Sequence, residues 1–197
     1  MNIIGLLRHG PTAWNHLKQI QGIADIPLDA SSFDAAPWQR LLGDHGPWDH
    51  IVTSSLRRCR ETCQLLFPGR PYDIDSDLRE QDWGEWTGKT LKEIIAASPG
   101  IVEAQEKLGW DFTPPGGECR RDALARAHRA IRRATGNQDG ERILFITHSG
   151  IINIILNHLE NTAFVPEQSS QVAKRALHLL RQDGGQLSIL KTNIGIQ

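Results

Sequence analysis

Hydrophobic positions along the chain fall into two patterns that alternate. Short apolar runs cover residues 2–8, 50–55, 72–78 and 141–150, and we predict a strand over each. Apolar residues at helical spacing predict helices over residues 37–46, 56–67, 118–135 and 151–159. Strands that alternate with helices indicate an α/β fold, a three-layer α/β/α sandwich with a mainly parallel sheet covered on both faces.

The remaining segments complete this picture. Residues 173–193 predict two strands around Asp183-Gly184-Gly185, a hairpin signal that would add an antiparallel C-terminal edge to the sheet. Two short helices are expected over 89–97 and 101–108, before the loop TPPGGE at 113–118. At this length we predict a single domain over residues 1–197, in which residues 88–115 form a cap segment over the substrate.

Composition limits the class of partner. Of the 197 residues 39% are hydrophobic, and the formal net charge is −1 with a pI near 6.7. Binding to nucleic acid or to a membrane surface favours a large positive excess, so we expect neither partner. Any anionic ligand must then meet a local cluster of arginines. The N-terminus has no basic region and no stretch reaches membrane-spanning length, which favours a cytoplasmic protein.

Cysteines and most histidines give no sign of a metal site. The odd number of cysteines, Cys59, Cys63 and Cys119, suits a reducing cytosol, and we interpret them as core thiols. The histidines without ligand spacing are His16, His45, His50, His128, His158 and His178. We therefore expect no metal and no cofactor. The arginine-rich run RAHRAIRRA at 126–134 is interpreted as a solvated helix face.

Two predicted strands end in a histidine that is soon followed by glycine. The first run ends in Arg8-His9-Gly10, and the strongest strand ends in Thr147-His148-Ser149-Gly150. Ligands of open α/β sheets bind at the carboxyl ends of parallel strands, near helix N-termini. The segments SSLRRCRET and LREQDWGEW follow the other two strands. We therefore expect histidines, arginines and a glutamate to meet at one edge of the sheet.

Five segments, in this order, resemble signatures of the histidine phosphatase superfamily, also called phosphoglycerate mutase-like. LLRHGPTAWN resembles its opening signature, TSSLRRCRET its Ser-x-Leu-x-Arg segment and LREQDWGEWTG its Leu-x-Glu segment. PPGGE is similar to a common loop of the family, and ITHSG resembles its second histidine motif. The resemblance spans most of the chain and agrees with the fold predicted above.

The resemblance implies that His9 is the nucleophile, whose neutral imidazole attacks phosphorus and becomes a phosphohistidine. The other ring nitrogen should then donate to a carbonyl oxygen, which fixes the tautomer. Arg8, Arg58 and His148 would surround the phosphoryl oxygens, because fixed cationic donors stabilise a loose transition state. The register of the motif favours Arg58, with Arg57 as the alternative.

The same resemblance implies that Glu80 is the general acid that protonates the leaving oxygen, and then the base that activates water. A carboxyl group in this role must be kept protonated by burial or by the charge of the bound phosphate. The register favours Glu80, with Asp82 as the alternative. Trp83 and Trp86 either pack the rim or stack on the substrate.

Further contacts to the substrate are expected from Asn15, Thr12, Gln21, Gly22 and Ser149. The superfamily often has Glu where Pro11–Thr12 stand, so Thr12 either donates to phosphate or shapes the loop. Ser149 takes a place often held by glycine, and Asn153 lies where many phosphatases carry arginine. These departures leave the catalytic set intact and concern the identity of the substrate.

The short cap bears on the type of reaction. A mutase must hold its phosphohistidine in a closed, water-poor site, which calls for extra chain around the glutamate and before the second histidine. We therefore expect a metal-independent phosphomonoesterase acting on a small phosphorylated metabolite, similar to the α-ribazole and broad-specificity phosphatase branches. Phosphoglycerate mutase-type transfer is the alternative. A non-catalytic phosphate-binding or regulatory module is a third reading, which the retention of nucleophile and acid disfavours.

Overall fold

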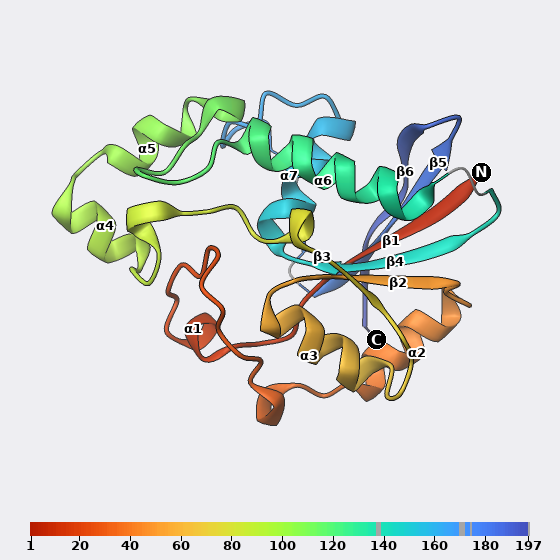
Figure 1. Cartoon of the computed structure of the whole chain (residues 1–197). Coiled ribbons are helices and arrows are strands. Elements are labelled where there is room, and N and C mark those ends of the chain that lie inside the picture. Colours follow the sequence, from red (N-terminus) through yellow and green to blue (C-terminus); the bar gives the residue numbers. More distant parts are fainter. Residues whose placement is uncertain (137–138, 170–171, 174, 197) are drawn as a thin grey trace.

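The computed structural model describes residues 1–136, 139–169, 172–173 and 175–196. Its centre is a six-stranded sheet in the order β3-β2-β4-β1-β5-β6 (Figure 1). The parallel strands are β1 (Asn2–Arg8), β2 (His50–Ser54), β3 (Asp73–Asp75) and β4 (Arg142–Thr147). The antiparallel edge consists of β5 (Ala176–Asp183) and β6 (Gln186–Gly195). The predicted α/β fold, with its antiparallel C-terminal edge, is confirmed.

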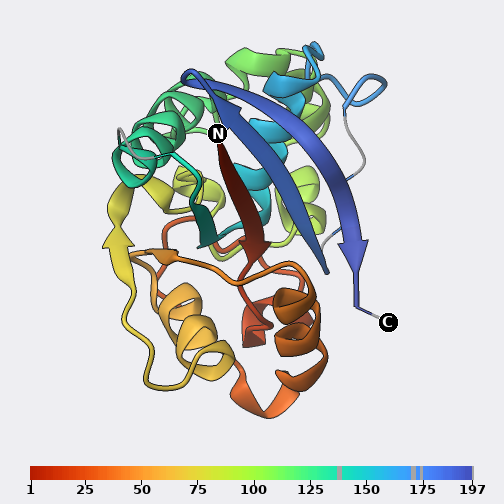
Figure 2. The same ribbon diagram turned by 90° about the vertical axis from the view of Figure 1, so that its right-hand side faces the viewer.

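Helices cover both faces of the sheet, as the two views of the ribbon show (Figures 1 and 2). The helices are α1 (Ala13–His16), α2 (Ala36–Asp44), α3 (Arg57–Leu66), α4 (Leu91–Ala97), α5 (Ile101–Glu106), α6 (Arg120–Thr135) and α7 (Ser149–Leu159). Ile4 and Leu6 of β1 pack under α6 and α7, while Leu7 packs toward α2 and α3. The central strands are thus buried on both sides, which explains their continuous apolar runs.

Several element boundaries differ from the sequence prediction. The strand expected over 72–78 stops at Asp75, because the Asp75 carboxylate accepts from the backbone N–H of Asp77 and starts the 3-10 helix η2 (Ser76–Leu78). The strand expected over 141–150 stops at Thr147, where its ladder with β1 ends, and α7 begins at Ser149. Helix α2 ends at Asp44, and α6 begins at Arg120 rather than 118.

The predicted cap segment contains α4, α5 and the 3-10 helix η4 (Gly109–Asp111), and α4 and α5 lie away from the sheet in Figure 1. A small separate cluster of Trp86, Ile94 and Phe112 holds it together. The start of the cap is also tied to the loop after α1. The backbone N–H of Ile20 donates to the Lys89 carbonyl at 2.9 Å, and the N–H of Gly88 donates to the Ile20 carbonyl at 2.8 Å. The cap therefore packs beside the carboxyl ends of the parallel strands.

Within the described residues, no helix combines the length and apolar character needed to cross a bilayer. Cys59, Cys63 and Cys119 are free thiols, the first two buried. The hairpin turn at Gly184 and Gly185 uses positive φ angles of 53° and 82°, as the sequence signal predicts.

Candidate active site

Parallel pairing of β1 with β4 brings the two predicted histidines together. Arg8 is opposite Thr147 in the ladder, and the backbone N–H of His9 donates to the Thr147 carbonyl at 2.9 Å. The next residue on each strand is therefore a histidine at the same edge of the sheet. The ring centroids of His9 and His148 are 5.2 Å apart.

The His9 ring is held as a neutral imidazole with one nitrogen free. Its Nδ1 is 2.7 Å from the Gly10 carbonyl oxygen, which can only accept, so Nδ1 carries the proton. This leaves the lone pair on Nε2. Burial, followed by the charges of Arg8 and Arg58, holds the pKa of His9 well below its ordinary value.

His148 is fully buried beside the His9 ring. Its Nε2 is 2.8 Å from the Ser54 hydroxyl oxygen and 3.5 Å from the Cys59 sulfur. Burial, followed by the charge of Arg58, also lowers the pKa of His148 well below its ordinary value. In this structure His148 contacts Ser54 and Cys59, and it does not line the cavity described next.

A cavity of about 290 Å³ opens at this edge of the sheet. All the predicted site residues except Thr12 and His148 line it, together with Trp83, for which two roles were left open above, and with Gln19 and Ile20, which were not predicted. The lining residues are Arg8, His9, Asn15, Gln19, Ile20, Gln21, Gly22, Arg58, Glu80, Trp83 and Ser149. We call it the anion pocket.

Two guanidinium groups, from the fully buried Arg58 and the partly buried Arg8, give the anion pocket its charge. Arg58 is fully buried, and its two terminal nitrogens donate to the carbonyls of Ala24 and Gly22 at 2.7 and 2.8 Å. The Nε–H groups of Arg8 and Arg58 are buried without a hydrogen-bond partner. Burial lowers the pKa of both groups. Buried donors normally have partners, and the side chains that carry these two both line the pocket, which favours a site for an anion there.

The choice between Arg57 and Arg58 follows from their surroundings. The Arg57 side chain is about half exposed and pairs with Glu61 at 2.9 Å one helical turn later. Arg58 points the other way, into the anion pocket. The geometry therefore places Arg58 at the site and Arg57 at the surface.

Thr12 caps the short helix α1 instead of facing the pocket. Its hydroxyl donates to Asn15 Oδ1 at 3.1 Å and accepts from the Asn15 backbone N–H at 3.3 Å, and it is fully buried. Of the two readings given above, the structure supports the one in which Thr12 shapes the loop. Because Asn15 Oδ1 is engaged with Thr12, its amide NH₂ is the group left to face the pocket.

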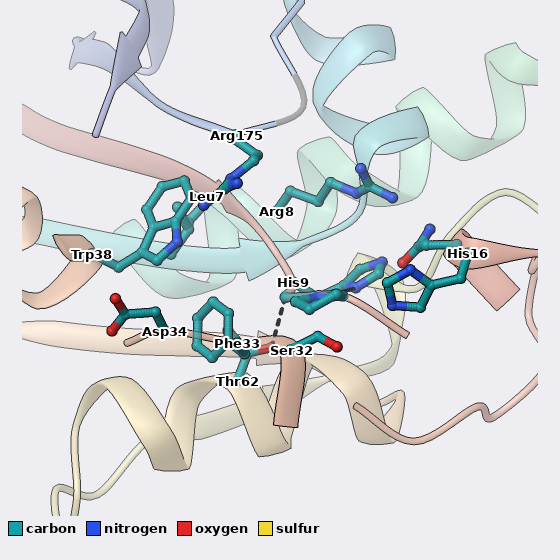
Figure 3. A pocket seen from close by; sticks show the side chains of 13 residues that line it. Leu7, Arg8, His9, His16, Ser32, Phe33, Asp34, Trp38, Thr62 and Arg175 are labelled. Carbon is teal, nitrogen blue, oxygen red and sulfur yellow. Dashed lines mark hydrogen bonds between the residues drawn. The ribbon is translucent and has the colours of Figure 1, made fainter. Parts of the chain in front are cut away.

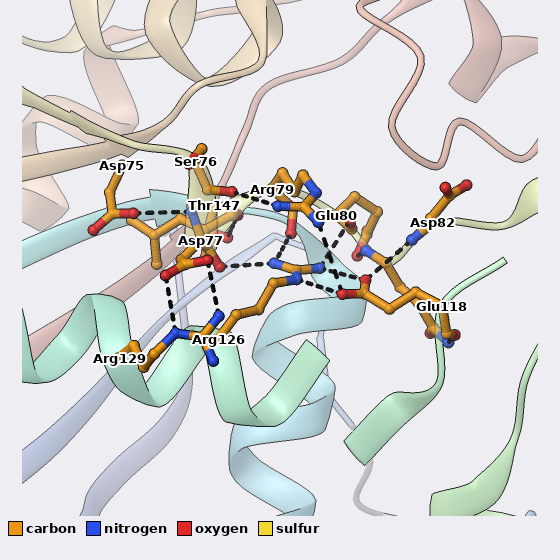
Figure 4. Close-up of polar contacts among 12 residues, drawn as sticks. Asp75, Ser76, Asp77, Arg79, Glu80, Asp82, Glu118, Arg126, Arg129 and Thr147 are labelled. Atoms are coloured by element: carbon orange, nitrogen blue, oxygen red, sulfur yellow. Dashed lines mark hydrogen bonds and ion pairs between the residues drawn. The ribbon is translucent and has the colours of Figure 1, made fainter. Parts of the chain in front are cut away.

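Glu80 and Asp82 also have different surroundings (Figure 4). Glu80 lines the pocket, and its carboxylate accepts from the backbone N–H groups of Gly150 and Gln81 at 3.1 and 3.0 Å. The Asp82 carboxylate accepts from the N–H of Gly84 at 2.9 Å and stabilises the turn there. A Cβ on Gly150 would lie 2.3 Å from the Glu80 oxygen, so only glycine permits this approach.

A larger hollow of about 420 Å³ also borders His9 (Figure 3). It shares Arg8, His9 and Asn15 with the anion pocket and is otherwise lined mainly by Phe33, Trp38 and neighbouring polar groups such as Arg175. Neither Arg58 nor Glu80 reaches it. The smaller anion pocket therefore has the residues that an anion and a proton transfer need.

Two residues near Glu80 have surroundings that the sequence did not predict: Arg126, which was expected on a solvated helix face, and Glu118, which was given no role. Arg126 is only 2% exposed, so its part of the arginine-rich run is not a solvated face. Its side chain binds Glu118, from the PPGGE loop, at 2.7 Å. The register of Arg126 could have indicated its burial, since it falls on the apolar side of α6 with Ala123 and Ala130.

Among the described residues, no group of three or more His, Cys, Asp or Glu side chains is placed to hold a metal ion.

Comparison with known proteins agrees with this geometry. A family model for the histidine phosphatase superfamily (branch 1) matches residues 4–195. The chain is 32% identical to phosphoglycerate mutase-like protein 4 of Arabidopsis thaliana, over 81% of this chain and 72% of that protein. It is 34% identical to glucosyl-3-phosphoglycerate phosphatase of Mycolicibacterium vanbaalenii, over 75% and 69%. It is 27% identical to adenosylcobalamin/alpha-ribazole phosphatase of Salmonella typhimurium, over 78% and 77%.

Solved structures give the same result. The mycobacterial glucosyl-3-phosphoglycerate phosphatase complexed with VO3 superposes with a TM-score of 0.85 at 25% identity, covering 99% of this chain and 100% of that chain. YhfR of Bacillus stearothermophilus superposes with a TM-score of 0.84 at 26% identity, covering 100% and 98%. The resemblance predicted from the five sequence motifs is thus confirmed.

Proposed function

The chain belongs to the histidine phosphatase superfamily, branch 1, and is a phosphoric monoester hydrolase; we propose that it cleaves a small phosphorylated metabolite of the cytoplasm through a phosphohistidine on His9, without a metal ion. One observation carries this proposal. A neutral His9 with a free Nε2 stands beside two buried, unpartnered guanidinium donors, in a pocket also lined by Glu80.

In the first step, His9 Nε2 forms a bond to phosphorus while the bond from phosphorus to the ester oxygen breaks. Glu80 gives its proton to the departing alkoxide, which leaves as an alcohol. In the second step, water attacks phosphorus, Glu80 takes the proton of that water, and the bond to Nε2 breaks. Inorganic phosphate is released and His9 returns to its neutral form.

Arg8 and Arg58 supply the positive charge for both steps. The loose transition state of phosphoryl transfer spreads negative charge over the equatorial oxygens, so fixed donors aimed at them lower the barrier. The lowered pKa of His9 matters here, because it keeps the nucleophile unprotonated on the acidic side of neutrality.

Hydrolysis of p-nitrophenyl phosphate by the purified protein tests the proposal. We expect turnover in metal-free buffer that EDTA does not reduce, and loss of turnover in the His9→Ala variant with phosphate binding retained. Full activity in His9→Ala, or complete loss of wild-type activity on EDTA treatment, would overturn the mechanism.

Mutase activity is the second candidate, because several similar proteins are named phosphoglycerate mutase-like or probable phosphoglycerate mutases. The short α4–α5 cap supports hydrolysis, since it gives little chain with which to exclude water from a phosphohistidine. With 3-phosphoglycerate and a bisphosphate primer, we expect release of inorganic phosphate to exceed isomerisation. Rapid isomerisation with little phosphate release would favour the mutase.

A further inference from the structure

We propose that the ion pair between the buried Arg126 and the partly buried Glu118 positions the general acid, and that it sets the efficiency of proton transfer from Glu80. This inference rests on the proposed function, in which Glu80 protonates the leaving group. Neither residue lines the anion pocket. Both act on the backbone that carries Glu80 (Figure 4).

The segment that carries Glu80 has no sheet ladder to hold it. Strand β3 ends at Asp75, and after η2 the chain runs on without regular structure to Glu80. The Arg126 guanidinium supplies hydrogen bonds to this backbone that a neighbouring strand would supply in a sheet. It donates to the carbonyls of Asp77, Arg79 and Glu80 at 2.7, 2.6 and 3.0 Å.

Glu118 holds the other side of the same segment. Its carboxylate accepts two hydrogen bonds from Arg126, at 2.7 and 2.8 Å, and one from the backbone N–H of Asp82 at 3.3 Å. Its own backbone N–H donates to the Asp82 carbonyl at 2.9 Å, and its carbonyl accepts from the Gln81 side chain at 2.7 Å. The chain is therefore fixed both at Glu80 and just after it.

This arrangement suits positioning better than simple stabilisation. Buried ion pairs are weak sources of stability, because burying two charges costs about as much as their attraction returns. The guanidinium is a rigid fork whose donors here fix three carbonyls and a carboxylate at once, which an ammonium group cannot reproduce. Since misplacing a reacting group by about 1 Å can cost on the order of 10²-fold in rate, a fixed backbone under Glu80 has a direct catalytic consequence.

A comparison of two leaving groups tests the proposal. p-Nitrophenolate leaves without much help from an acid, whereas the alkoxide of glycerol phosphate needs a proton. We expect Arg126→Lys and Glu118→Gln to lower kcat for glycerol phosphate at least about tenfold more than kcat for p-nitrophenyl phosphate, as a weakened general acid would. The Kd for inorganic phosphate should stay within about threefold of wild type, which also shows that each variant is folded.

Arg129→Lys is the matched control. Arg129 lies on the same helix and pairs with the Asp77 carboxylate at 3.2 Å, but its side chain is about half exposed and it donates to none of the three carbonyls. We expect Arg129→Lys to leave both esters unaffected. An equal loss for both esters in Arg126→Lys, or no loss in a folded Glu118→Gln, would overturn the positioning role.

Glu80→Gln separates failure of this inference from failure of the proposed function. If Glu80→Gln shows no preference between the two esters, Glu80 is not the general acid and both proposals fall. If Glu80→Gln shows the preference and the folded Arg126 and Glu118 variants do not, only the positioning role falls. If Glu118 and Glu80 act through the same proton transfer, the double variant Glu80→Gln/Glu118→Gln should have a kcat only a little lower than Glu80→Gln alone.

Discussion

Two adjacent arginines at the start of α3 have opposite surroundings. Arg57 pairs with Glu61 at the surface, while Arg58 is fully buried and holds the carbonyls of Gly22 and Ala24 with its terminal nitrogens. The unpartnered Nε–H of Arg58 remains for a ligand. One side chain thus both shapes the loop of the anion pocket and supplies charge to it.

Replacing each arginine by lysine separates these roles. Arg58→Lys keeps a positive charge but cannot donate to both carbonyls and to a phosphoryl oxygen, so we expect kcat/KM for p-nitrophenyl phosphate to fall on the order of 10²–10³-fold. Arg57→Lys should change it by less than about threefold, because exposed pairs contribute little. Equal effects of the two substitutions would contradict the assignment of Arg58 to the pocket.

At the scale of elements, the junction of β4 and α7 holds Glu80, the proposed general acid, at the same edge of the sheet as His9, the proposed nucleophile. His148 ends the strand and Ser149 begins the helix, so the N–H groups of the first helical turn are free for a ligand or side chain. One of them, from Gly150, donates to the Glu80 carboxylate at 3.1 Å. A side chain at this glycine would occupy the place of the carboxylate.

Gly150→Ala is therefore expected to lower activity without a comparable loss of stability. The added Cβ would meet the Glu80 oxygen at 2.3 Å, and the end of a flexible side chain can move away at little cost. We expect kcat to fall at least about tenfold for an alkyl phosphate, as expected for a displaced general acid. Thermal unfolding and steady-state kinetics would measure the two effects.

Gly43→Ala provides the comparison. Gly43 lies in α2, and a Cβ there would have no atom within 4 Å. Alanine should raise stability by about 0.5–1 kcal/mol and leave kcat unchanged. Wild-type kcat in Gly150→Ala would show that the contact between Gly150 and Glu80 has no part in the reaction.

Much of the fold and of the site follows from single residues of the sequence. Strands β1 and β4 could be predicted from their continuous apolar runs because both are buried on both faces of the sheet. The histidine at the end of each run then indicated where the candidate site lies. The boundaries near 72–78 and 141–150 were wrong because local side-chain caps and the end of a ladder, rather than hydrophobicity, stop those strands. Arg126 was misread because charge alone does not show which arginine of a run turns toward the core.

At the scale of the whole molecule, buried neutral histidines link stability to pH. His178 of β5 is 1% exposed, and its Nδ1 accepts from the N–H of Asn193 in β6 at 3.3 Å. Burial lowers its pKa to about 4. His178 takes up a proton near pH 6.5 in the unfolded chain but only near pH 4 in the folded chain. Its contribution to the free energy of unfolding is therefore complete above about pH 6.5 and is lost as the pH falls from about 6.5 to about 4.

We expect the free energy of unfolding to fall as pH decreases from about 6.5 to about 4, with His178 contributing about 3 kcal/mol of that loss. His9 and His148 act in the same direction. His178→Asn keeps a hydrogen-bond acceptor and should make the slope shallower in urea unfolding at several pH values. An unchanged slope in His178→Asn would contradict this account.

Trapping the phosphorylated enzyme tests the central claim most directly. The protein is quenched in alkali during turnover of a phosphate monoester, digested with trypsin after Arg8 and Lys18, and the peptide 9–18 is sequenced by mass spectrometry. That peptide contains both His9 and the exposed His16, which serves as an internal control. We predict an acid-labile phosphoryl group on His9 alone, absent in His9→Ala. Turnover with no phosphorylated peptide, or with phosphate on another residue, would contradict the account.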